Sequence, residues 1–541
     1  MSLRRTLTAL TAVAALALSG CALTTPSGPG SANVTDPAGK NPSSLVLADT
    51  LELGGFNPVS GYGELGTSPL YDGLLRLDST GDDKLPALKP ALAASEPTLE
   101  ADHTTWRVKI RRGVTFHDGT TLGPEDVVAT YRAILDPRSA SPLASTLDMV
   151  AGVRADGDDV VFSLRYPYSD FPTRLLIGIA PSEKLTGGPS DESSLNTQPI
   201  GTGPYRLARL SPDEATFDAN ARYWDGVPQV SRLTVVRVAD DNTRAQRLLA
   251  GDLDGAQLPP LLAHTFAGKD GWTEVAVKSA DWRGVSLPKN SAFARDPAAR
   301  MAMNLAVNRD AMVSQVLGGE GIPAFTPVSP VYGDAYDPGA TFPFDRARAE
   351  RLLDAAGWTK GTDGFRHKGA DVARFTVAYR PTDIVRRDLA TAFAADMRAI
   401  GVDVQLEGLD FAAIEPRRED LGILLGGGDK PYSLDSQLYG PLHTRVPGAS
   451  TWDNPGDFSS PRLDAALERA RRSTDAAERT AAYRAVQADY VEDPSYVMFA
   501  FLRHTYVMKD DGWQPGPSVT EPHSHGVSWG PWWNLAGWRR S

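Results

Sequence analysis

A strand–helix–strand unit in the second half of the chain limits the possible folds more than any other feature. FTVAYR (375–380) and VDVQLEGL (402–409) have the pattern of β-strands, and DIVRRDLATAFAADMRAIG (383–401) has apolar residues at helical spacing. A helix that joins two neighbouring strands brings the chain back to the same end of the sheet, so the strands run parallel. We therefore predict an α/β fold in which this helix covers a parallel pair.

Other segments extend this mixed α/β plan along the chain. Alternation of apolar and polar residues predicts strands, and apolar residues three or four positions apart predict helices. A single helix is expected at 296–319, and a helical hairpin at 460–494. The aromatic C-terminal tail is expected to form a strand or a clasp packed on the body. Predicted strands cover 43–48, 104–117, 159–166, 204–224, 231–240 and 495–509, and further predicted helices cover 241–250 and 344–358.

The stretch GVTFHDGTTLGPEDVVATY (113–131) contains a histidine, three acids and several hydroxyls, which raises the question of a metal or catalytic site. We interpret it as structural. His117-Asp118-Gly119 has the composition of a turn, and Pro124 suits the first turn of a helix. Glu125 and Asp126 follow at the helix N-terminus, which favours negative charge. A metal site would need several ligands at converging positions, which this stretch lacks.

The N-terminus has the pattern of an export signal. Residues 1–20 combine a basic start with a short apolar run, as in a secretory signal peptide. Leu18-Ser19-Gly20-Cys21 is similar to the lipobox of bacterial lipoproteins, in which the cysteine is acylated. Residues 21–43 are rich in Pro, Gly, Ser and Thr, as in a flexible tether. We expect an exported protein that is lipid-anchored through Cys21 to the outer face of the cell membrane.

Composition excludes several classes of function. The formal net charge is −12 and the sequence contains one cysteine, so no internal disulfide is expected. An acidic chain is unsuited to nucleic acid, whose phosphates need clustered Lys and Arg. After the signal peptide no apolar run is long enough to span a bilayer. A length of 541 residues predicts two or three domains.

Several motifs in order resemble the solute-binding proteins of bacterial ABC importers, in the dipeptide, oligopeptide and nickel group (family 5). The strongest is WRVKIRRGVTFHDGTTLGPEDVVATYRAILDP (106–137), and the resemblance runs from about residue 44 to 510. The other matching segments are IGTGPYRLAR (200–209), 219–256, RMAMNLAVNRDAMVSQVLGGEGIPAFTPVSP (300–330) and RARAERLLDAAGW (346–358).

The resemblance implies a two-lobed periplasmic-binding-protein-like fold of type II, in the large peptide-binding subgroup, with an additional domain. It implies a monomer without catalytic activity or cofactor, which captures a peptide or another small solute and delivers it to a membrane permease. ATP hydrolysis belongs to separate subunits, in line with the missing Gly-x-x-x-x-Gly-Lys-Ser/Thr motif. We assign lobe I to 44–66, 197–283 and 496–541, the additional domain to 67–196, and lobe II to 284–495.

The dipeptide-binding branch of this family implies two charged ligand contacts. There an Arg-Pro pair after a strand holds the ligand carboxylate, which corresponds to Arg380-Pro381, and a Gly-Asp pair holds the amine, which corresponds to Asp429. An arginine can bind a carboxylate with two hydrogen bonds, and an aspartate can pair with an ammonium. The alternative is that both are solvated loop charges.

The family's other ligand-facing segment corresponds to NPVSGYGELGTS (57–68), where backbone groups can pair with an extended peptide. Aromatic residues are further candidates for the pocket, although each could equally pack in a core. The remaining candidate ligand residues are Gly63, Gly66, Thr67, Ser68, Tyr432 and Trp452, with Tyr62 and Trp282 as further pocket aromatics.

Departures from the family pattern leave the cargo open. Gly426-Gly427-Gly428 replaces the usual tryptophan near the amine-binding aspartate, and we expect this to open the pocket. A metal chelate is an alternative cargo because His443, His504, His523 and His525 lie in the second half. However, Ala449 stands where the nickel-binding branch has a ligating histidine.

Two enzyme motifs are present in the sequence without their usual context. Gly61-x-Gly63-x-x-Gly66 matches a dinucleotide fingerprint but does not follow a predicted strand. Gly526-x-Ser528-x-Gly530 matches the nucleophile elbow of esterases, and an exported hydrolase using Ser528 is the alternative from a different class. No histidine follows Ser528, where the usual order of the triad would place it.

Overall fold

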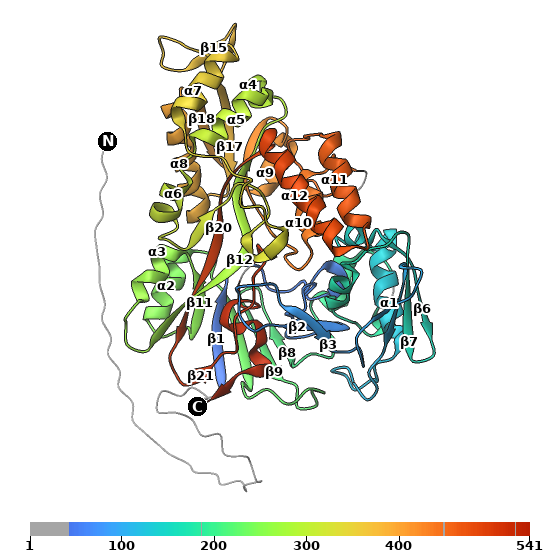
Figure 1. Cartoon of the computed structure of the whole chain (residues 1–541). Helices are drawn as coiled ribbons and strands as arrows, with labels where there is room; N and C mark the ends of the chain where they lie inside the picture. Colours follow the sequence, from blue (N-terminus) through green and yellow to red (C-terminus); the bar gives the residue numbers. More distant parts are fainter. Residues whose placement is uncertain (1–42, 186, 447–448, 525, 541) are drawn as a thin grey trace, which may run out of the picture. The chain divides into compact units, whose positions relative to one another are not determined.

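The computed structural model describes residues 43–185, 187–446, 449–524 and 526–540 (Figure 1). The predicted signal peptide, Cys21 and most of the tether lie outside the described residues. Strands and helices alternate along the described chain, which confirms the mixed α/β class. No helix in these ranges combines the length and the apolar character needed to cross a bilayer.

Within the described residues, eleven strands form one mixed sheet in the order β18-β17-β19-β12-β20-β11-β1-β10-β9-β8, with β13 pairing off this path with β20. The sheet is therefore continuous from the second half of the chain to its first strand. Its strands are β1 (Ser44–Asp49), β8 (Tyr205–Leu210), β9 (Glu214–Ala219), β10 (Arg232–Arg237), β11 (Gly255–Leu258), β12 (Trp272–Ser286), β13 (Gly321–Pro323), β17 (Arg374–Tyr379), β18 (Asp403–Gly408), β19 (Leu421–Gly427) and β20 (Tyr496–Lys509).

Shorter strands form separate sheets. The largest, in the order β4-β5-β7-β6, has four strands among the described residues and is covered by helix α1. These shorter strands are β2 (Leu75–Asp78), β3 (Ala87–Pro90), β4 (Thr98–Leu99), β5 (Thr105–Lys109), β6 (Val150–Asp156), β7 (Asp159–Leu164), β14 (Thr359–Lys360), β15 (Arg366–Lys368), β16 (Asp371–Val372), β21 (Trp513–Gln514) and β22 (Arg539–Arg540).

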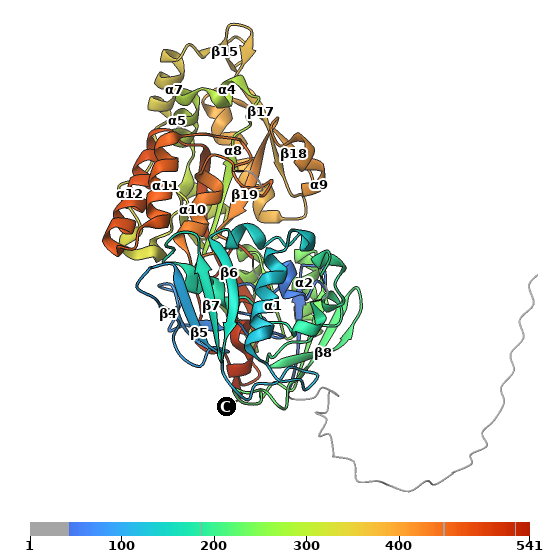
Figure 2. The same cartoon turned by 90° about the vertical axis from the view of Figure 1, so that its right-hand side faces the viewer.

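The helices lie mainly in the second half of the chain, as the sequence predicts. Figure 2 shows α10, α11 and α12 together on one side of the molecule. The α-helices are α1 (Pro124–Leu135), α2 (Asp241–Leu249), α3 (Pro260–Ala263), α4 (Ala292–Arg295), α5 (Pro297–Ala306), α6 (Arg309–Ala311), α7 (Arg346–Ala355), α8 (Ile384–Ala399), α9 (Phe411–Ile414), α10 (Leu434–Leu442), α11 (Pro461–Arg472) and α12 (Ala476–Glu492).

The strand–helix–strand unit has the predicted form. β17 pairs in parallel with β18 from Arg374↔Asp403 to Tyr379↔Gly408, and α8 connects the two strands. The side chain of Asp383 accepts a hydrogen bond from the backbone N–H of Arg386 and caps the helix. The parallel pair predicted from this segment is therefore confirmed.

The stretch 113–131 is structural, as predicted. The side chain of Asp118 accepts the backbone N–H of Thr120, and Pro124 stands at the start of α1. The carboxylate of Asp126 accepts the N–H of Gly123 at the cap and that of Ser182. Burial lowers the pKa of His117 to about 4, so its ring is neutral near neutral pH.

The single helix predicted for 296–319 is wrong. The structure divides it into α5, α6 and a π-helix, Met312–Val316. The side chain of Asn308 accepts the backbone N–H of Ala311, which ends one helix and begins the next. The hydrophobic spacing continued across this break and concealed it.

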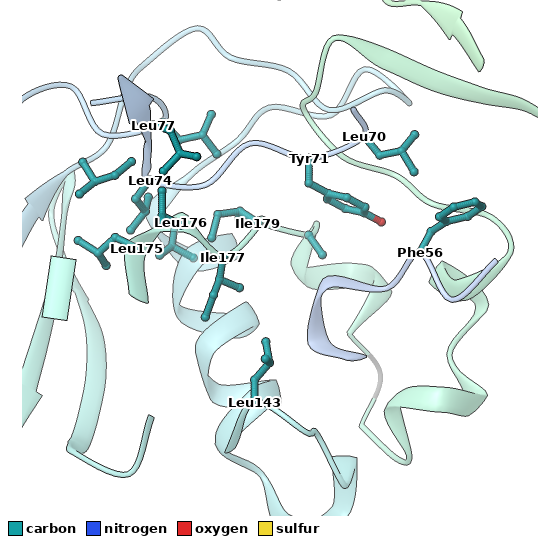
Figure 3. Packing of buried hydrophobic residues seen from close by; sticks show 14 of the residues in the cluster. Phe56, Leu70, Tyr71, Leu74, Leu77, Leu143, Leu175, Leu176, Ile177 and Ile179 are labelled. Atoms are coloured by element: carbon teal, nitrogen blue, oxygen red, sulfur yellow. The ribbon is translucent and has the colours of Figure 1, made fainter. Parts of the chain in front are cut away.

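The two largest hydrophobic clusters of buried residues divide the described chain into two lobes. The first cluster combines residues from 45–235 with Val277 and others from 506–538, and we call the part around it lobe I; part of this cluster is shown in Figure 3. The second cluster draws on residues between 282 and 501, and we call the part around it lobe II. The segment 67–196 shares the first cluster, and its boundary as an additional domain stays a prediction.

β12 and β20 connect the two lobes. On β12, Val277 packs in the first cluster and Trp282 in the second. On β20, Tyr506 packs in the first cluster and Phe501 in the second. Between Lys278 and Trp282 the register of the β12–β20 pair shifts. The change of lobe therefore coincides with an irregularity in the pairing, where strands bend.

The C-terminal tail packs on lobe I as the 3₁₀ helix η12 (Gly530–Gly537), followed by the short strand β22. Trp532 is buried edge-on against Tyr506, and a Cβ at Gly255 would lie 2.3 Å from its ring. The predicted clasp is confirmed, whereas the tail is mainly a 3₁₀ helix and forms only a two-residue strand.

Candidate functional site

A cavity of about 880 Å³ lies between lobe I and lobe II. Its walls come from the loop after β1, from residues 142–149 and from the segment between β19 and α11 (Figure 1). The two strands that connect the lobes contribute Trp282 and Tyr496. Its size is within the range of pockets that enclose small ligands, so we take it as the candidate functional site.

Turn geometry shapes the loop of residues 57–68. The side chain of Asn57 caps the 3₁₀ helix η1 (Pro58–Ser60) by accepting the N–H of Val59, and its amide donates to the carbonyl of Ser190 at 2.9 Å. Gly63 has a φ of +68°, and a Cβ there would lie 2.5 Å from that of Ser68. Glycine is therefore required for a compact loop, and the fingerprint's strand–turn–helix context is missing here.

Most of the predicted loop residues line the cavity. Gly63, Thr67 and Ser68 are among its walls, whereas Gly66 faces the side chain of Leu176. The hydroxyl of Ser68 accepts the N–H groups of Leu70 and Tyr71 and is thus used within the loop.

The glycines Gly426, Gly427 and Gly428 end β19 and begin the following loop, and the space beside each of them is filled. A Cβ at Gly427 would lie 2.3 Å from the indole of Trp282, and one at Gly428 would lie 2.3 Å from the carbonyl oxygen of Ala280. Trp282 itself is 2% exposed and packs edge-on against Tyr496. An indole from the neighbouring strand fills the space beside Gly427, although all three glycines line the cavity, so the expectation that they open the pocket stays a prediction.

Asp429 is an uncommitted charge in the cavity wall. It is exposed, and no hydrogen bond or ion pair ties its carboxylate to the described part of the chain. Asp453 lies in the same wall, where burial and the nearby charge of Asp429 raise its pKa. Two acids in one wall favour a cationic group in the ligand.

The cations of the cavity are mostly paired. Lys430 faces Glu64 across the lobes at 3.5 Å, and Arg471 donates two hydrogen bonds to Asp435 while its guanidinium lies over the ring of Tyr439. Arg445, which also lines the cavity, donates to backbone carbonyls and not to a described acid, so a ligand meets free charge of both signs.

The structure places Arg380 outside the walls of the cavity. Its exposed guanidinium lies over the ring of Phe411 at 5.5 Å, and Phe411 packs on Trp452, which does line the cavity. Arg380 and Asp429 therefore do not share a wall in this structure. The contact of Arg380 with a ligand carboxylate stays a prediction.

Tyr432 connects lobe II to the C-terminal segment. Its hydroxyl donates to the carbonyl of Thr520 at 3.0 Å, and burial raises its pKa well above the usual value. Tyr62, by contrast, lines the cavity and packs edge-on against Phe56 and Tyr71.

Arg445 and His443 line the cavity; Arg445 was not predicted, and His443 was considered only among the histidines that suggest a metal chelate. Nη1 of Arg445 donates to the carbonyls of Ser450, Thr451 and Asp453, which holds the side chain in place. The ring of His443 stacks on that of Tyr439 at 4.3 Å. Both residues lie in the loop after α10, and no sequence pattern predicts which loop residues face a cavity.

Polar contacts hold lobe II against the 142–174 region. The hydroxyl of Tyr168 donates to Asp435 at 3.0 Å, and the guanidinium of Arg174 donates to the hydroxyl of Ser436 at 2.5 Å. The hydroxyl of Ser433 donates to Asp170 at 2.7 Å. The structure is therefore a closed arrangement in which the lobes meet beside the cavity (Figure 2).

A buried ionic cluster lies where β12 and β20 pass between the lobes. Asp281 pairs with Arg283 and with the imidazoles of His504 and His523. Burial opposes the charge on Asp281, but Arg283 and His523 offset it and hold the pKa of this carboxyl well below its usual range. Glu521 accepts hydrogen bonds at 2.7 Å from His504 and from Tyr506.

The geometry of a hydrolase or of a metal centre is missing from the described residues. Ser528 follows a segment outside strands and precedes η12, so the strand–turn–helix of a nucleophile elbow is not formed. Within the described ranges no three His, Cys, Asp or Glu side chains are grouped to hold a metal ion. His525 lies outside the described residues.

Residues 87–447, well over half of the chain, match the family described as "Bacterial extracellular solute-binding proteins, family 5 Middle". Protein XP55 of Streptomyces lividans is 40% identical over 472 residues, which are 86% of this chain and 85% of that protein.

Solved structures share the fold. NikZ from Campylobacter jejuni, in complex with Ni(L-His), is 24% identical with a TM-score of 0.82 and covers 92% of this chain and 99% of its own. The oligopeptide-binding protein AppA from Bacillus subtilis, in complex with a nonapeptide, is 23% identical with a TM-score of 0.79 and has the same coverage. The two-lobed α/β fold implied by the sequence is confirmed.

Proposed function

Because the chain belongs to the bacterial extracellular solute-binding proteins of family 5, we propose that it captures a small peptide or peptide-like solute with a free ammonium group. The solute is enclosed between lobe I and lobe II and delivered to the permease of an ABC importer.

The observation that carries this proposal is the free carboxylate of Asp429 in the wall of the cavity between the lobes. An ammonium placed there gains a charge-assisted hydrogen bond in a partly desolvated site. It also relieves the repulsion between Asp429 and Asp453. A neutral or anionic solute would leave Asp429 without a partner, whereas Asp453 keeps the N–H of Ser450 and the nearby charges of Lys430 and Arg445.

The loop of residues 57–68 supports the same class of solute. Backbone groups of this loop stand beside the hydroxyl of Thr67 at the cavity, where an extended main chain can pair with them. At about 880 Å³, the cavity suits a short peptide better than a long one. A chelate of a metal with an amino acid is the competing cargo of this fold.

Closure follows from the two connecting strands. Ligand contacts to both lobes favour the closed arrangement over an open one, and β12 and β20 bend where their register shifts. The protein has no catalytic role in this proposal. A lipid on Cys21 keeps the monomer near its permease. Residues 44–66, 197–283 and 496–541 move as lobe I, and the additional domain 67–196, which shares their hydrophobic cluster, moves with them.

The test is native mass spectrometry of the polypeptide Ala22–Ser541, purified without added ligand, followed by identification of what it releases. Short peptide masses support the proposal and give the peptide length. A metal chelate or an anionic solute would overturn it while leaving the protein in its family. An empty protein would be screened with peptides by thermal shift, where a ligand at about 100 times its Kd adds about 2.7 kcal/mol.

A further inference from the structure

A second cavity, of about 260 Å³, opens beside the first. Its floor is one face of the lobe I sheet, with Tyr205 of β8, Phe217 of β9, and Leu233 and Val235 of β10. Its roof is η12 together with the loop 51–56, so the C-terminal aromatic tail closes it.

The walls of this second cavity are mainly apolar, and their polar residues are Asp49, Glu52, Thr67, Ser528 and Asn534 together with two tyrosines. The indole N–H of Trp533, a roof residue, donates to the carbonyl of Pro517 and is therefore already paired. The hydroxyl of Tyr205 on its floor is buried without a hydrogen-bond partner among the described residues, so a polar ring edge could also be accommodated. The apolar part resembles an engineered aliphatic cavity of about 150 Å³, which stays dry and binds benzene. The apolar wall residues are Leu51, Leu53, Phe56, Pro69, Pro204, Phe217, Leu233, Val235, Val527, Trp532, Trp533, Leu535 and Ala536.

The two cavities share a mouth. Leu51, Tyr62, Thr67 and Ser528 belong to the walls of both, as does Asp49. Leu51 is 58% exposed although it is a large aliphatic residue between two cavities. An apolar group of a solute that extends from the first cavity into the second would cover the exposed side chain of Leu51.

Asp49 fixes the shape of this mouth. Its half-buried carboxylate accepts the backbone N–H of Leu51 at 3.1 Å and that of Val527 at 3.3 Å, and so joins the two loops that border the opening. A Cβ at Gly526 would lie 2.9 Å from the same carboxylate, which leaves no room for a larger residue in this conformation. The opening is therefore held by charge-assisted hydrogen bonds rather than by loose loop contacts.

We infer that the second cavity is a specificity pocket, which takes a bulky apolar or aromatic group of the solute held in the first cavity. This inference rests on the proposed function and narrows it to solutes with such a group. A volume of about 260 Å³ leaves room for an indole ring. A solute without the group leaves the space empty and forfeits those dispersion contacts.

The pocket is tested first with 5-fluoroindole as a free probe, by ¹⁹F NMR on the polypeptide Ala22–Ser541. The expected result is a bound signal that the variant Ala536→Phe weakens at least tenfold, because the new ring fills the pocket from its half-buried roof. Ala335→Phe is the matched control, since Ala335 is also half-buried in a 3₁₀ helix but lies in lobe II. No bound signal, or equal binding to Ala536→Phe, overturns the inference.

If Ala536→Phe fails to fold, Leu51→Asp replaces it, because Leu51 is exposed and its substitution leaves the core intact. A charge at the mouth is expected to weaken 5-fluoroindole binding at least fivefold. Binding equal to that of the wild-type chain would overturn the inference.

Peptides then separate this inference from the proposed function. Tripeptides of alanine with one tryptophan are expected to displace 5-fluoroindole, and to bind at least tenfold more tightly than trialanine. If they bind but leave the probe in place, the inference fails and the proposed function stands. If the tripeptides do not bind while Ala536→Phe still removes the probe, the pocket stands and the peptide proposal fails.

Discussion

The imidazole of His504 lies 3.0 Å from a carboxylate oxygen of Asp281, and both side chains are buried where β12 and β20 pass from one lobe to the other. The second ring nitrogen of His504 is 2.7 Å from Glu521. An imidazole between two carboxylates is stabilised in its charged form. The connection between the lobes therefore contains a histidine whose protonation depends on pH.

The stability of the protein is expected to fall at alkaline pH. Burial disfavours the imidazolium, but the hydrogen bonds to Asp281 and Glu521 offset it and raise the pKa of His504 to about 9. An unfolded histidine releases its proton near pH 6.5. The folded state therefore binds more protons between these values, and the contribution of His504, complete below pH 6.5, is lost as pH rises through 9.

Urea unfolding at pH values from 6 to 10 measures this effect. The free energy of unfolding is expected to drop by about 3 kcal/mol, at 1.36 kcal/mol for each unit of pKa. His504→Gln is expected to lower stability at pH 6 and to flatten the dependence. His367→Gln is the control, because His367 pairs only at the surface with Asp363. A dependence in His504→Gln equal to that of the wild type would contradict the assignment.

Tyr168→Phe is expected to favour the open arrangement of the lobes. The variant keeps the ring but removes the hydroxyl that donates to Asp435 across the lobes, and a buried hydrogen bond to a charged group is worth about 1.5–3 kcal/mol. Small-angle X-ray scattering without ligand should give a larger radius of gyration. Tyr223→Phe removes a hydroxyl that donates to Asp72 at 2.9 Å within lobe I, and should leave the radius unchanged.

Asp429→Asn is expected to weaken binding of an ammonium-bearing solute by about 2–5 kcal/mol, since the charge pair is partly desolvated when the lobes close. The free protein should keep its stability, because Asp429 is exposed. Isothermal titration calorimetry with the released solute measures the affinity. Asp371→Asn, at an exposed aspartate of the small β14–β16 sheet, is the matched control. Equal affinity of both variants would remove Asp429 from the site.

Two arginines, Arg380 and Arg445, are candidates for binding a carboxylate of the solute. If the family resemblance holds for Arg380, Arg380→Ala costs about 2–5 kcal/mol of affinity and Arg445→Ala costs little. Arg445 lines the cavity whereas Arg380 stacks outside it on Phe411, so we expect the opposite order. Titration of both variants with the same solute distinguishes the two candidates. If Arg445→Ala lowers the affinity by less than about 0.5 kcal/mol, Arg380 remains the better candidate for the carboxylate contact.

Local patterns predicted much of the fold. The parallel pair of β17 and β18, the capped helix α1 and the hairpin of α11 and α12 each depend on interactions between residues close in sequence. The break before Asn308 was missed because its cap competes with a hydrophobic spacing that suits a longer helix.

The walls of the site could be predicted only in part. Asp429 and the loop of 57–68 were found by resemblance, but the place of Trp282 against Gly427 depends on a pairing between strands about 140 residues apart. Arg445 and the second cavity depend on loops whose course no local pattern gives. Long-range pairing and loop geometry therefore account for most of what the sequence did not predict.

The continuous sheet also sets an order for folding. β1 is the first strand of the described chain, but its neighbour in the sheet, β11, also pairs with β20, which comes from residues 496–509. Trp532, from the C-terminal tail, packs against Gly255 of β11. Lobe I cannot complete its core until residues 496–538 are available, however early its first strands are synthesised. Lobe I of a nascent chain thus stays incomplete until residues 496–538 have been added, and a truncation before them would damage the part of the molecule that was made first.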